Sequence, residues 1–141
     1  MTPGPARSYF EDVELHDAVE TPAITLTAAH VGIYHGLTRE LDADPAAVPD
    51  LLPLCVAVGL GWRTPRAPLA VLALLGLDWQ PLRPLRAGDT VRSRSRIVAR
   101  RPLRDGGVIV EEREVLDQRG EVVQRGRFTY LVGKRPKEVA A

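Results

Sequence analysis

The chain has 141 residues, of which 45% are hydrophobic and 26% charged, a composition typical of globular rather than disordered proteins. This length suits one domain, residues 1–141, that buries roughly 70% of its unfolded surface, and it excludes a separate cofactor domain. The longest apolar run, Leu69 to Leu77, is about half as long as a membrane span, and the first residues lack a signal-peptide pattern. We therefore expect a cytoplasmic protein without a membrane segment.

Charge is balanced over the whole chain but not along it. Nineteen basic residues face eighteen acidic ones, so no overall field attracts nucleic acid. Residues 1–50 hold nine acids and two arginines, whereas residues 82–104 hold eight arginines and one aspartate. The single cysteine, Cys55, excludes an internal disulfide and a zinc site built on paired thiols. Nothing in the sequence implies a metal, nucleotide or redox cofactor.

The first half of the chain predicts a short strand and two helices. After a leading arm, residues 23–26 are β-prone, and Thr27 is a typical N-cap for a helix over residues 28–37. Polar and proline-containing residues then predict a loop over 38–49. Asp50 is expected to cap a second helix over residues 51–60, which is apolar all round and therefore predicted to be buried on every side, with Cys55 in the core.

The second half predicts an antiparallel sheet. Four strands are expected over residues 77–85, 90–99, 108–116 and 122–132, separated by turns rich in Gly and Asp. Residues 133–141 are expected to form a flexible tail. A sheet curled around one central apolar helix is an α+β fold. Its open strand edges favour edge-to-edge pairing into a dimer.

Several motifs, in this order and spacing, resemble the MaoC-like hydratases and dehydratases, which have the hot-dog fold. The resemblance covers residues 9–132. It rests on four segments: Tyr9-Phe10-Glu11-Asp12, then Ile24-Thr25 with Tyr34-His35-Gly36-Leu37-Thr38, then Pro84-Leu85-Arg86-Ala87-Gly88-Asp89-Thr90-Val91, and finally Gln118-Arg119-Gly120-Glu121-Val122-Val123 with Gly126.

The resemblance implies a site for an acyl thioester at a dimer interface, with the acyl chain carried by coenzyme A or acyl-carrier protein. In active members, an aspartate and a histidine in an Asp-x-Asn-Pro-x-His stretch position water and move the proton. A backbone amide at the start of the central helix stabilises the thioester enolate. Reversible addition of water to an enoyl thioester needs such preorganised donors and a base poised near neutral pH.

This sequence departs from that pattern in the loop between the two predicted helices. Alignment on Leu37-Thr38 puts Glu40 at the aspartate, Asp42 at the asparagine and Pro45 at the histidine, and proline transfers no proton. The resemblance therefore implies Glu40 as the base. His35, five residues before Glu40, or Asp42 is expected to assist it. The resemblance also implies the helix start at Asp50 and Leu51 as the enolate donor, although the Asp50 carboxylate would sit beside a developing anion.

Several residues have both a functional and a purely structural interpretation. Glu40 is either the base or a solvated loop carboxylate paired with Arg39, and His35 either assists it or packs on the helix. Arg92, Arg94 and Arg96 share one strand face, where they either pair with glutamates of the next strand or dock phosphates of coenzyme A or an acidic carrier. The acyl pocket is expected at three residues: Tyr34, Leu54 and Val58.

The leading hypothesis is a MaoC-like dehydratase or hydratase, a lyase acting on an acyl thioester in a biosynthetic pathway such as polyketide metabolism. It would work as a homodimer, without nucleic acid, because the aromatic residues of a single-strand platform are missing. The alternative is a non-catalytic hot-dog subunit that binds acyl chains and forms a heterodimer with an active paralogue. A third hypothesis assigns the same hot-dog fold to a thioesterase, isomerase or cyclase.

Overall fold

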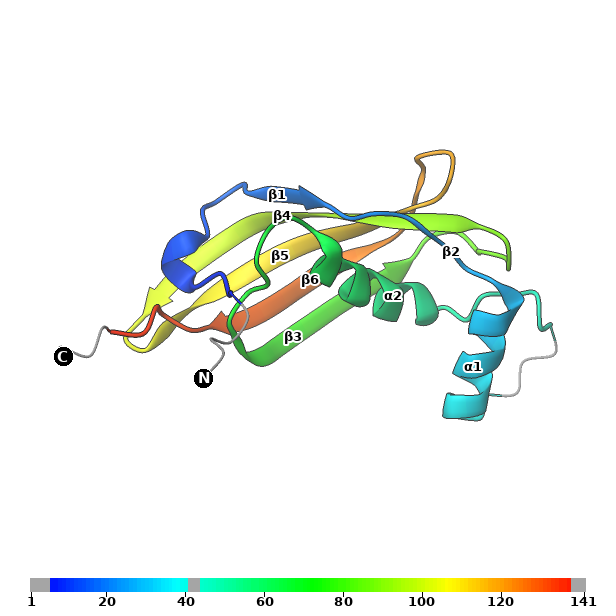
Figure 1. Ribbon diagram of the computed structural model, residues 1–141, viewed down its shortest axis with the longest axis horizontal. Helices are drawn as coiled ribbons and strands as arrows, with labels where there is room; N and C mark the ends of the chain where they lie inside the picture. Colours follow the sequence, from blue (N-terminus) through cyan, green and yellow to red (C-terminus); the bar gives the residue numbers. More distant parts are fainter. Residues whose placement is uncertain (1–5, 41–43, 138–141) are drawn as a thin grey trace.

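An antiparallel sheet curves around a short helix in the computed structural model, which describes residues 6–40 and 44–137 (Figure 1). The helices are α1 (Ala28–Thr38) and α2 (Leu52–Leu60), with short 3-10 turns η1 (Phe10–Asp12) and η2 (Gly61–Arg63). The strands are β1 (Ala18–Glu20), β2 (Ile24–Thr25), β3 (Val71–Pro81), β4 (Thr90–Leu103), β5 (Gly106–Leu116) and β6 (Val122–Val132).

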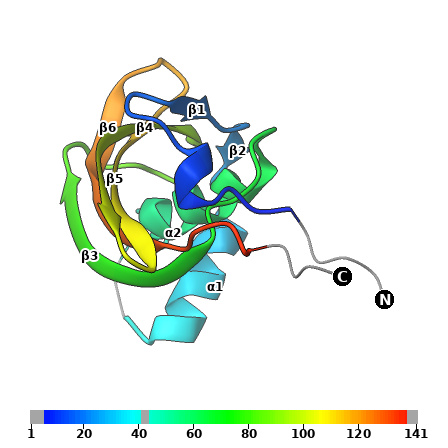
Figure 2. The ribbon, with the colours of Figure 1, turned by 90° about the vertical axis from the view of Figure 1, so that its left-hand side faces the viewer.

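The sheet has the order β1-β4-β5-β6-β3, and β2 extends the same edge as β1 by pairing with β4. All pairings are antiparallel, and the long strands β3 to β6 make most of the sheet. Figure 2 shows the curvature: the long strands wrap α2, while α1 projects away from the sheet. Strand β3 therefore forms one open edge of the sheet.

The expected α+β architecture and the first helix are confirmed. Thr27 caps α1 through reciprocal hydrogen bonds: its hydroxyl accepts from the His30 N–H at 3.3 Å, and its own N–H donates to the His30 ring at 3.1 Å. Arg39 ends the helix in the left-handed conformation, and its N–H donates to the His35 carbonyl at 2.9 Å. The short strand near residue 24 is also present as β2.

The third strand lies further towards the N-terminus than predicted. It spans Val71–Pro81 rather than residues 77–85, because its register with β6 runs from Val71 opposite Val132 to Pro81 opposite Gln124. The apolar run that starts at Leu69 is thus strand, and the segment after Pro81 bends away. Strand β4 also continues to Leu103, beyond the predicted residue 99, because β5 pairs with it along its whole length. The elements η1 and β1 were not predicted.

Two expectations for the second helix are wrong. Asp50 does not cap α2: the N-cap is Leu51, whose side chain makes no capping bond, and Pro53 lies in the first turn. The helix is also not buried on every side. Leu51 and Val58 are 49% and 39% exposed, and Cys55 between them is exposed rather than in the core. One apolar stripe of α2 therefore faces outwards in the single chain.

Two separate hydrophobic clusters fill the space inside the sheet. The first surrounds α2 and contains Leu52, Ala57, Val91 and Val115. The second lies under η1 and contains Phe10, Val13, Ile97, Ile109 and Val132. Within the described part of the chain, no helix is long and apolar enough to cross a bilayer.

The first residues of the expected tail are attached to the fold. Gly133 accepts a hydrogen bond from the Phe10 N–H at 2.9 Å, and its N–H donates to Ala70 O at 2.9 Å. Arg135 pairs with Asp12. The last part of the predicted tail, residues 138–141, lies outside the described residues.

Candidate functional site

Tyr34, Glu40 and Asp50 lie near one another, although three different parts of the chain supply them. Tyr34 is half-buried on α1 and packs against the cluster around α2. Burial raises the pKa of the Tyr34 phenol, and the charge and hydrogen bond of Glu40 raise that pKa further, as do the charges of Cys55 and Asp50. Glu40 is exposed, and its backbone N–H donates to the Thr38 hydroxyl at 3.2 Å. A carboxylate and a phenol are thus held beside the start of α2.

His35 lies next to this group but does not join it. Its ring meets the Tyr34 ring edge-on, with centroids 6.0 Å apart. Both ring nitrogens are buried without a hydrogen-bond partner among the described residues. The expected His35–Glu40 pair is therefore not formed, because Glu40 interacts with Tyr34 instead. Asp42, the other expected assistant, lies outside the described residues.

The start of α2 is fixed by a buried side chain from the sheet. Gln124, on β6, is 2% exposed. Its amide nitrogen donates to the Asp50 carbonyl at 2.8 Å, and its amide oxygen accepts from the Trp79 indole at 2.9 Å. The Leu52 N–H donates to the Pro49 carbonyl at 3.1 Å. The helix start is thus tied to β3 and β6, although Asp50 makes no side-chain cap.

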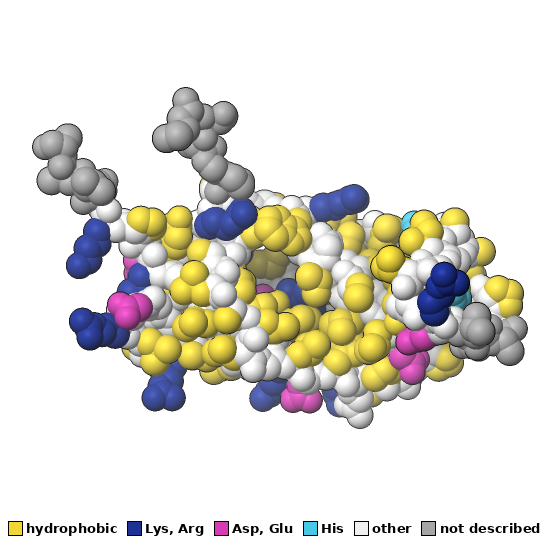
Figure 3. Space-filling model, turned by 90° about the horizontal axis from the view of Figure 1, so that it is seen from below, with side chains coloured by type: hydrophobic (Ala, Val, Ile, Leu, Met, Phe, Trp, Pro, Cys, Tyr) yellow, Lys and Arg dark blue, Asp and Glu magenta, His cyan; other side chains and the backbone are white. Residues whose placement is uncertain are grey.

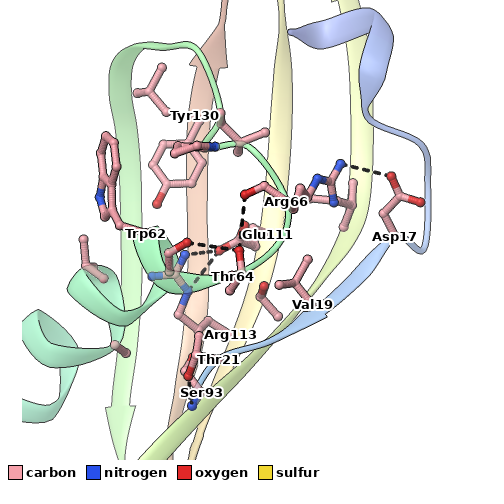
Figure 4. Close-up of a pocket in the computed structure, with 18 of the residues that line it drawn as sticks. Asp17, Val19, Thr21, Trp62, Thr64, Arg66, Ser93, Glu111, Arg113 and Tyr130 are labelled. Atoms are coloured by element: carbon pink, nitrogen blue, oxygen red, sulfur yellow. Dashed lines mark hydrogen bonds and ion pairs between the residues drawn. The ribbon is translucent and has the colours of Figure 1, made fainter. Parts of the chain in front are cut away.

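A cavity of about 240 Å³ lies between the second half of α2 and the concave face of the sheet. Val58, expected in an acyl pocket, lines it, whereas Tyr34 and Leu54 do not. Apolar walls come from Val19, Ala57, Leu69 and Ile97. Figure 4 shows that charged and hydroxyl side chains also point into this space, among them Thr64, Arg113 and Tyr130.

An ion pair lies on the sheet side of the cavity. The Arg113 and Glu111 side chains are each 10% exposed, and Arg113 Nε donates to Glu111 Oε1 at 3.0 Å. The guanidinium carbon of Arg113 lies 4.6 Å from the centre of the Phe128 ring, which stacks on Tyr130. Burial raises the pKa of Tyr130 to about 12, against the opposing charge of Arg113.

These charges lie in a polar belt, which we define as Ser93 and Ser95 of β4 with Glu111 and Arg113 of β5. On β4 the belt is bounded by Val91 of the first cluster and Ile97 of the second. On β5 it is bounded in the same way by Val115 and Ile109. The belt therefore divides the interior into two apolar halves, and the cavity lies along it.

The comparisons agree with this architecture. No family model and no curated protein sequence matches the chain. A MaoC-like dehydratase from Rhodospirillum rubrum superposes with a TM-score of 0.79 at 23% identity, over 92% of this chain and 99% of that one. The chain has the hot-dog fold.

Two further neighbours are named for their reactions. An R-hydratase from Pseudomonas aeruginosa superposes with a TM-score of 0.74 at 12% identity, over 96% of this chain and 95% of that one. A 3R-hydroxyacyl-ACP dehydratase complex, HadBC, from Mycobacterium tuberculosis gives 0.66 at 14% identity, over 83% and 96%. The structural neighbours of this hot-dog chain are thus MaoC-like dehydratases and R-hydratases.

The arginines of the outer face are paired across the sheet. Arg94 lies 2.9 Å from Glu114, Arg96 lies 3.8 Å from Glu112, and Arg92 lies 3.9 Å from Glu20. The predicted pairing with glutamates of the next strand is confirmed for Arg94 and Arg96, whereas Arg92 pairs with Glu20 of β1 instead. These side chains point away from the cavity. Arg94 and Arg96 remain about half exposed. Among the described residues, no three His, Cys, Asp or Glu side chains gather as metal ligands.

Sequence reasoning missed the polar belt and Gln124. Pairing of Arg94 and Arg96 with Glu114 and Glu112 places these even-numbered residues of β5 on the outer face, which leaves the odd-numbered residues, from Ile109 to Val115, on the inner face. Glu111 and Arg113 have odd numbers, so the same alternation predicts that they are buried between Ile109 and Val115. For Gln124 no comparable signal exists, because its partners Trp79 and Asp50 are distant in sequence.

Proposed function

We propose that this hot-dog protein is a hydratase or dehydratase acting on an acyl thioester. The observation that carries the proposal is the packing of Tyr34 against the cluster around the start of α2, with Glu40 held next to the end of α1 close to the Tyr34 phenol. Within a fold whose neighbours include dehydratases and R-hydratases, this grouping combines a base with a helix N-terminus. Those two elements are what addition of water to an enoyl thioester requires.

In the proposed reaction, Glu40 takes a proton from water while the water oxygen bonds to C3 of the 2-enoyl thioester. The C2–C3 electron pair moves towards the thioester carbonyl, which becomes an enolate. The backbone amides of Asp50 and Leu51, at the positive end of α2, stabilise that charge. Glu40 then returns the proton to C2, and dehydration is the reverse. Tyr34 orients Glu40, and Asp42 is the proposed assistant.

The acyl chain is proposed to extend from the start of α2 along the helix, with Val58 lining its far part. Arg92, Arg94 and Arg96 are the proposed contacts for the phosphates of coenzyme A or for an acidic carrier protein. Their glutamate partners leave Arg94 and Arg96 partly exposed, so phosphate contacts compete with existing ion pairs. A phosphate therefore has to displace a glutamate at each position.

A homodimer is proposed because a broad apolar face is left open. Figure 3 shows hydrophobic side chains gathered on this face around the mouth of a hollow. The exposed stripe of α2 contributes Leu51, Val58 and, just after it, Trp62, which is 61% exposed. The edge strand β3 also exposes five aliphatic residues on its two sides, and α1 exposes two: Val71, Leu72, Leu74, Leu75, Leu77, Ile33 and Leu37. A soluble monomer rarely exposes such a surface, so a second copy is its proposed cover.

The test is a mass-detected assay of purified protein with 2-enoyl and 3-hydroxyacyl thioesters on coenzyme A and on carrier protein. Wild type is compared with Glu40→Gln and His35→Ala, and Glu14→Gln serves as the control because Glu14 is an exposed carboxylate elsewhere. Gain or loss of water that disappears in Glu40→Gln and persists in Glu14→Gln supports the proposal. Release of free thiol would instead indicate a thioesterase, and a product of unchanged mass an isomerase or cyclase.

The second candidate is a non-catalytic subunit that pairs with an active paralogue. One structural neighbour, HadBC, is described as a complex of a hydroxyacyl-ACP dehydratase, which makes this assembly a reasonable alternative. Absence of turnover on every thioester, with the dimer intact, would favour it. Full activity of the homodimer would exclude it.

A further inference from the structure

The cavity crosses the concave face of the sheet from one edge to the other. The strands β3, β6, β5, β4 and β1 each contribute to its wall, through Val71, Tyr130, Glu111, Ser95 and Val19. Polar side chains occur along its whole length, but most of the wall is apolar. An acyl chain can therefore lie across the sheet in this space, where burial of its methylene groups is favourable.

The two ends of the cavity differ. At the β3 end, the lining residues Val58, Trp62 and Val71 are themselves exposed, so the cavity opens on the apolar face (Figure 3). At the β1 end, Arg66 and Asp17 both line the cavity, and their side chains lie 3.1 Å apart. Figure 4 shows this pair between the loop after α2 and the segment before β1. The β1 end of the cavity is therefore closed by an ion pair.

The loop that carries Arg66 is also fixed at both of its ends. We call residues 64–69 the strap. The Thr64 hydroxyl holds its start by donating to a carbonyl at the end of α2 at 3.3 Å. The Ser8 hydroxyl holds its other end by donating to the Ala67 carbonyl at 2.6 Å. Loss of the ion pair would therefore open the β1 end of the cavity while the strap stays attached.

The proposed thioester site fixes the direction from which an acyl chain arrives. Val58, at the open end of the cavity, lies seven residues after Leu51, which is about 10 Å along an α-helix. A chain held at the start of α2 has to span that distance before it enters the cavity. Its far end then points towards the closed β1 end.

We propose that the Arg66–Asp17 pair is a gate that sets the longest acyl chain the protein accepts. This inference rests on the proposed function and deepens it by naming the substrate class: medium-length acyl chains, long enough to pass Val58 and short enough to end before Arg66. A longer chain has to displace the Arg66 side chain from Asp17 or fold back on itself. In a closed pocket, one surplus methylene already lowers kcat/KM by about tenfold or more.

The experiment measures kcat/KM for 2-enoyl thioesters of N-acetylcysteamine whose alkyl chain is lengthened one carbon at a time. For wild type we expect a maximum followed by a steep fall. Arg66→Ala should accept the first rejected chain at least about tenfold better than wild type does, and its maximum should move to longer chains. An unchanged profile in Arg66→Ala would overturn the inference.

Further variants separate the gate from a general effect of the substitution. Arg66→Lys keeps a cation opposite Asp17 and should retain the wild-type profile. Arg83→Ala breaks a different ion pair, with Glu121 in the turn before β6, and should retain it as well. A shift in Arg83→Ala as large as that in Arg66→Ala would refute the assignment.

A variant of the other partner covers the case in which Arg66→Ala does not fold. The Asp17 carboxylate also accepts a hydrogen bond from the Glu14 N–H at 2.9 Å, and an asparagine oxygen can still accept it. Asp17→Asn thus removes the charge while keeping this turn, and it should move the profile in the same direction as Arg66→Ala. A wild-type profile in Asp17→Asn would count against the gate.

Calorimetry with the corresponding saturated thioethers, which cannot be hydrated, separates this inference from the proposed function. Binding that falls beyond a length limit in wild type but not in Arg66→Ala, without turnover of any enoyl thioester, would uphold the gate and reject the hydratase. Turnover with the same length profile in both proteins would uphold the hydratase and reject the gate. Absence of both binding and turnover at every length would overturn both.

Discussion

Gln124 is the residue on which the position of the α2 start depends most directly. It is 2% exposed and makes two hydrogen bonds, to the Asp50 carbonyl and from the Trp79 indole. Replacement by leucine keeps a similar volume but leaves an acceptor and a donor unsatisfied, each at a cost of about 1–3 kcal/mol. We expect Gln124→Leu to lower the free energy of unfolding by about 3 kcal/mol in total.

Urea denaturation followed by tryptophan fluorescence measures this change, with the transition midpoint and the slope reported separately. Gln80→Leu on the neighbouring strand β3 is the control: Gln80 is exposed, so its effect should stay within about 0.5 kcal/mol. Trp79→Phe completes a double-mutant cycle, and the two substitutions together should cost less than the sum of their separate effects. A cost for Gln124→Leu no larger than that of Gln80→Leu would refute the reasoning.

Three further predictions follow from the described contacts. Gly107→Ala would place a Cβ 2.2 Å from the Phe10 ring, so it should destabilise by about 1–3 kcal/mol in urea denaturation, and addition of Phe10→Leu should recover part of that loss. The pKa of Asp89 is lowered, first by the hydrogen bond that its carboxylate accepts from the Arg86 N–H and then by the one from Gln118. Ionised Asp89 therefore stabilises the fold above the ordinary pKa of 3.8, and this contribution is lost as pH falls through the lower pKa of the folded state. The difference in unfolding free energy between wild type and Asp89→Asn, measured by urea denaturation, should disappear in acid. Leu72→Lys, on the open edge of β3, should turn a dimer into monomers in analytical ultracentrifugation, whereas Leu103→Lys at the end of β4 should not; an unchanged dimer in both would argue against pairing through β3.

Much of the fold was predictable because its signals are local. The capping residue Thr27 and the alternation along β4 to β6 each act within a few residues, and these elements are present where they were predicted, although β4 continues to Leu103. The third strand was misplaced because a continuous apolar run carries no period, so its ends depend on pairing with β6. The short strand β1 has no signal of its own and exists only because β4 offers it an edge.

The candidate site was less predictable because it is assembled from distant segments. Tyr34 and Glu40 were both selected from the sequence, but their contact depends on how the chain turns after α1 at Arg39, which adopts a positive φ of 63°. His35 was matched with Glu40 on spacing alone, and spacing does not decide between His35 and its neighbour Tyr34. Side-chain direction in a loop is set by tertiary packing, which one sequence does not display.

The error about α2 also bears on how the protein works. An apolar helix was expected to be enclosed by its own sheet, but the stripe through Leu51, Cys55 and Val58 remains exposed. Apolar residues on α1 and β3 are exposed as well, which also favours burial of this surface by a second copy of the chain. If a second copy supplies it, the start of α2, Glu40 and the mouth of the cavity would all lie near the subunit boundary. Dimerisation would then exclude water from the proposed thioester site, which strengthens the helix-dipole and amide interactions there. Assembly and activity should therefore be lost together when β3 carries a charge.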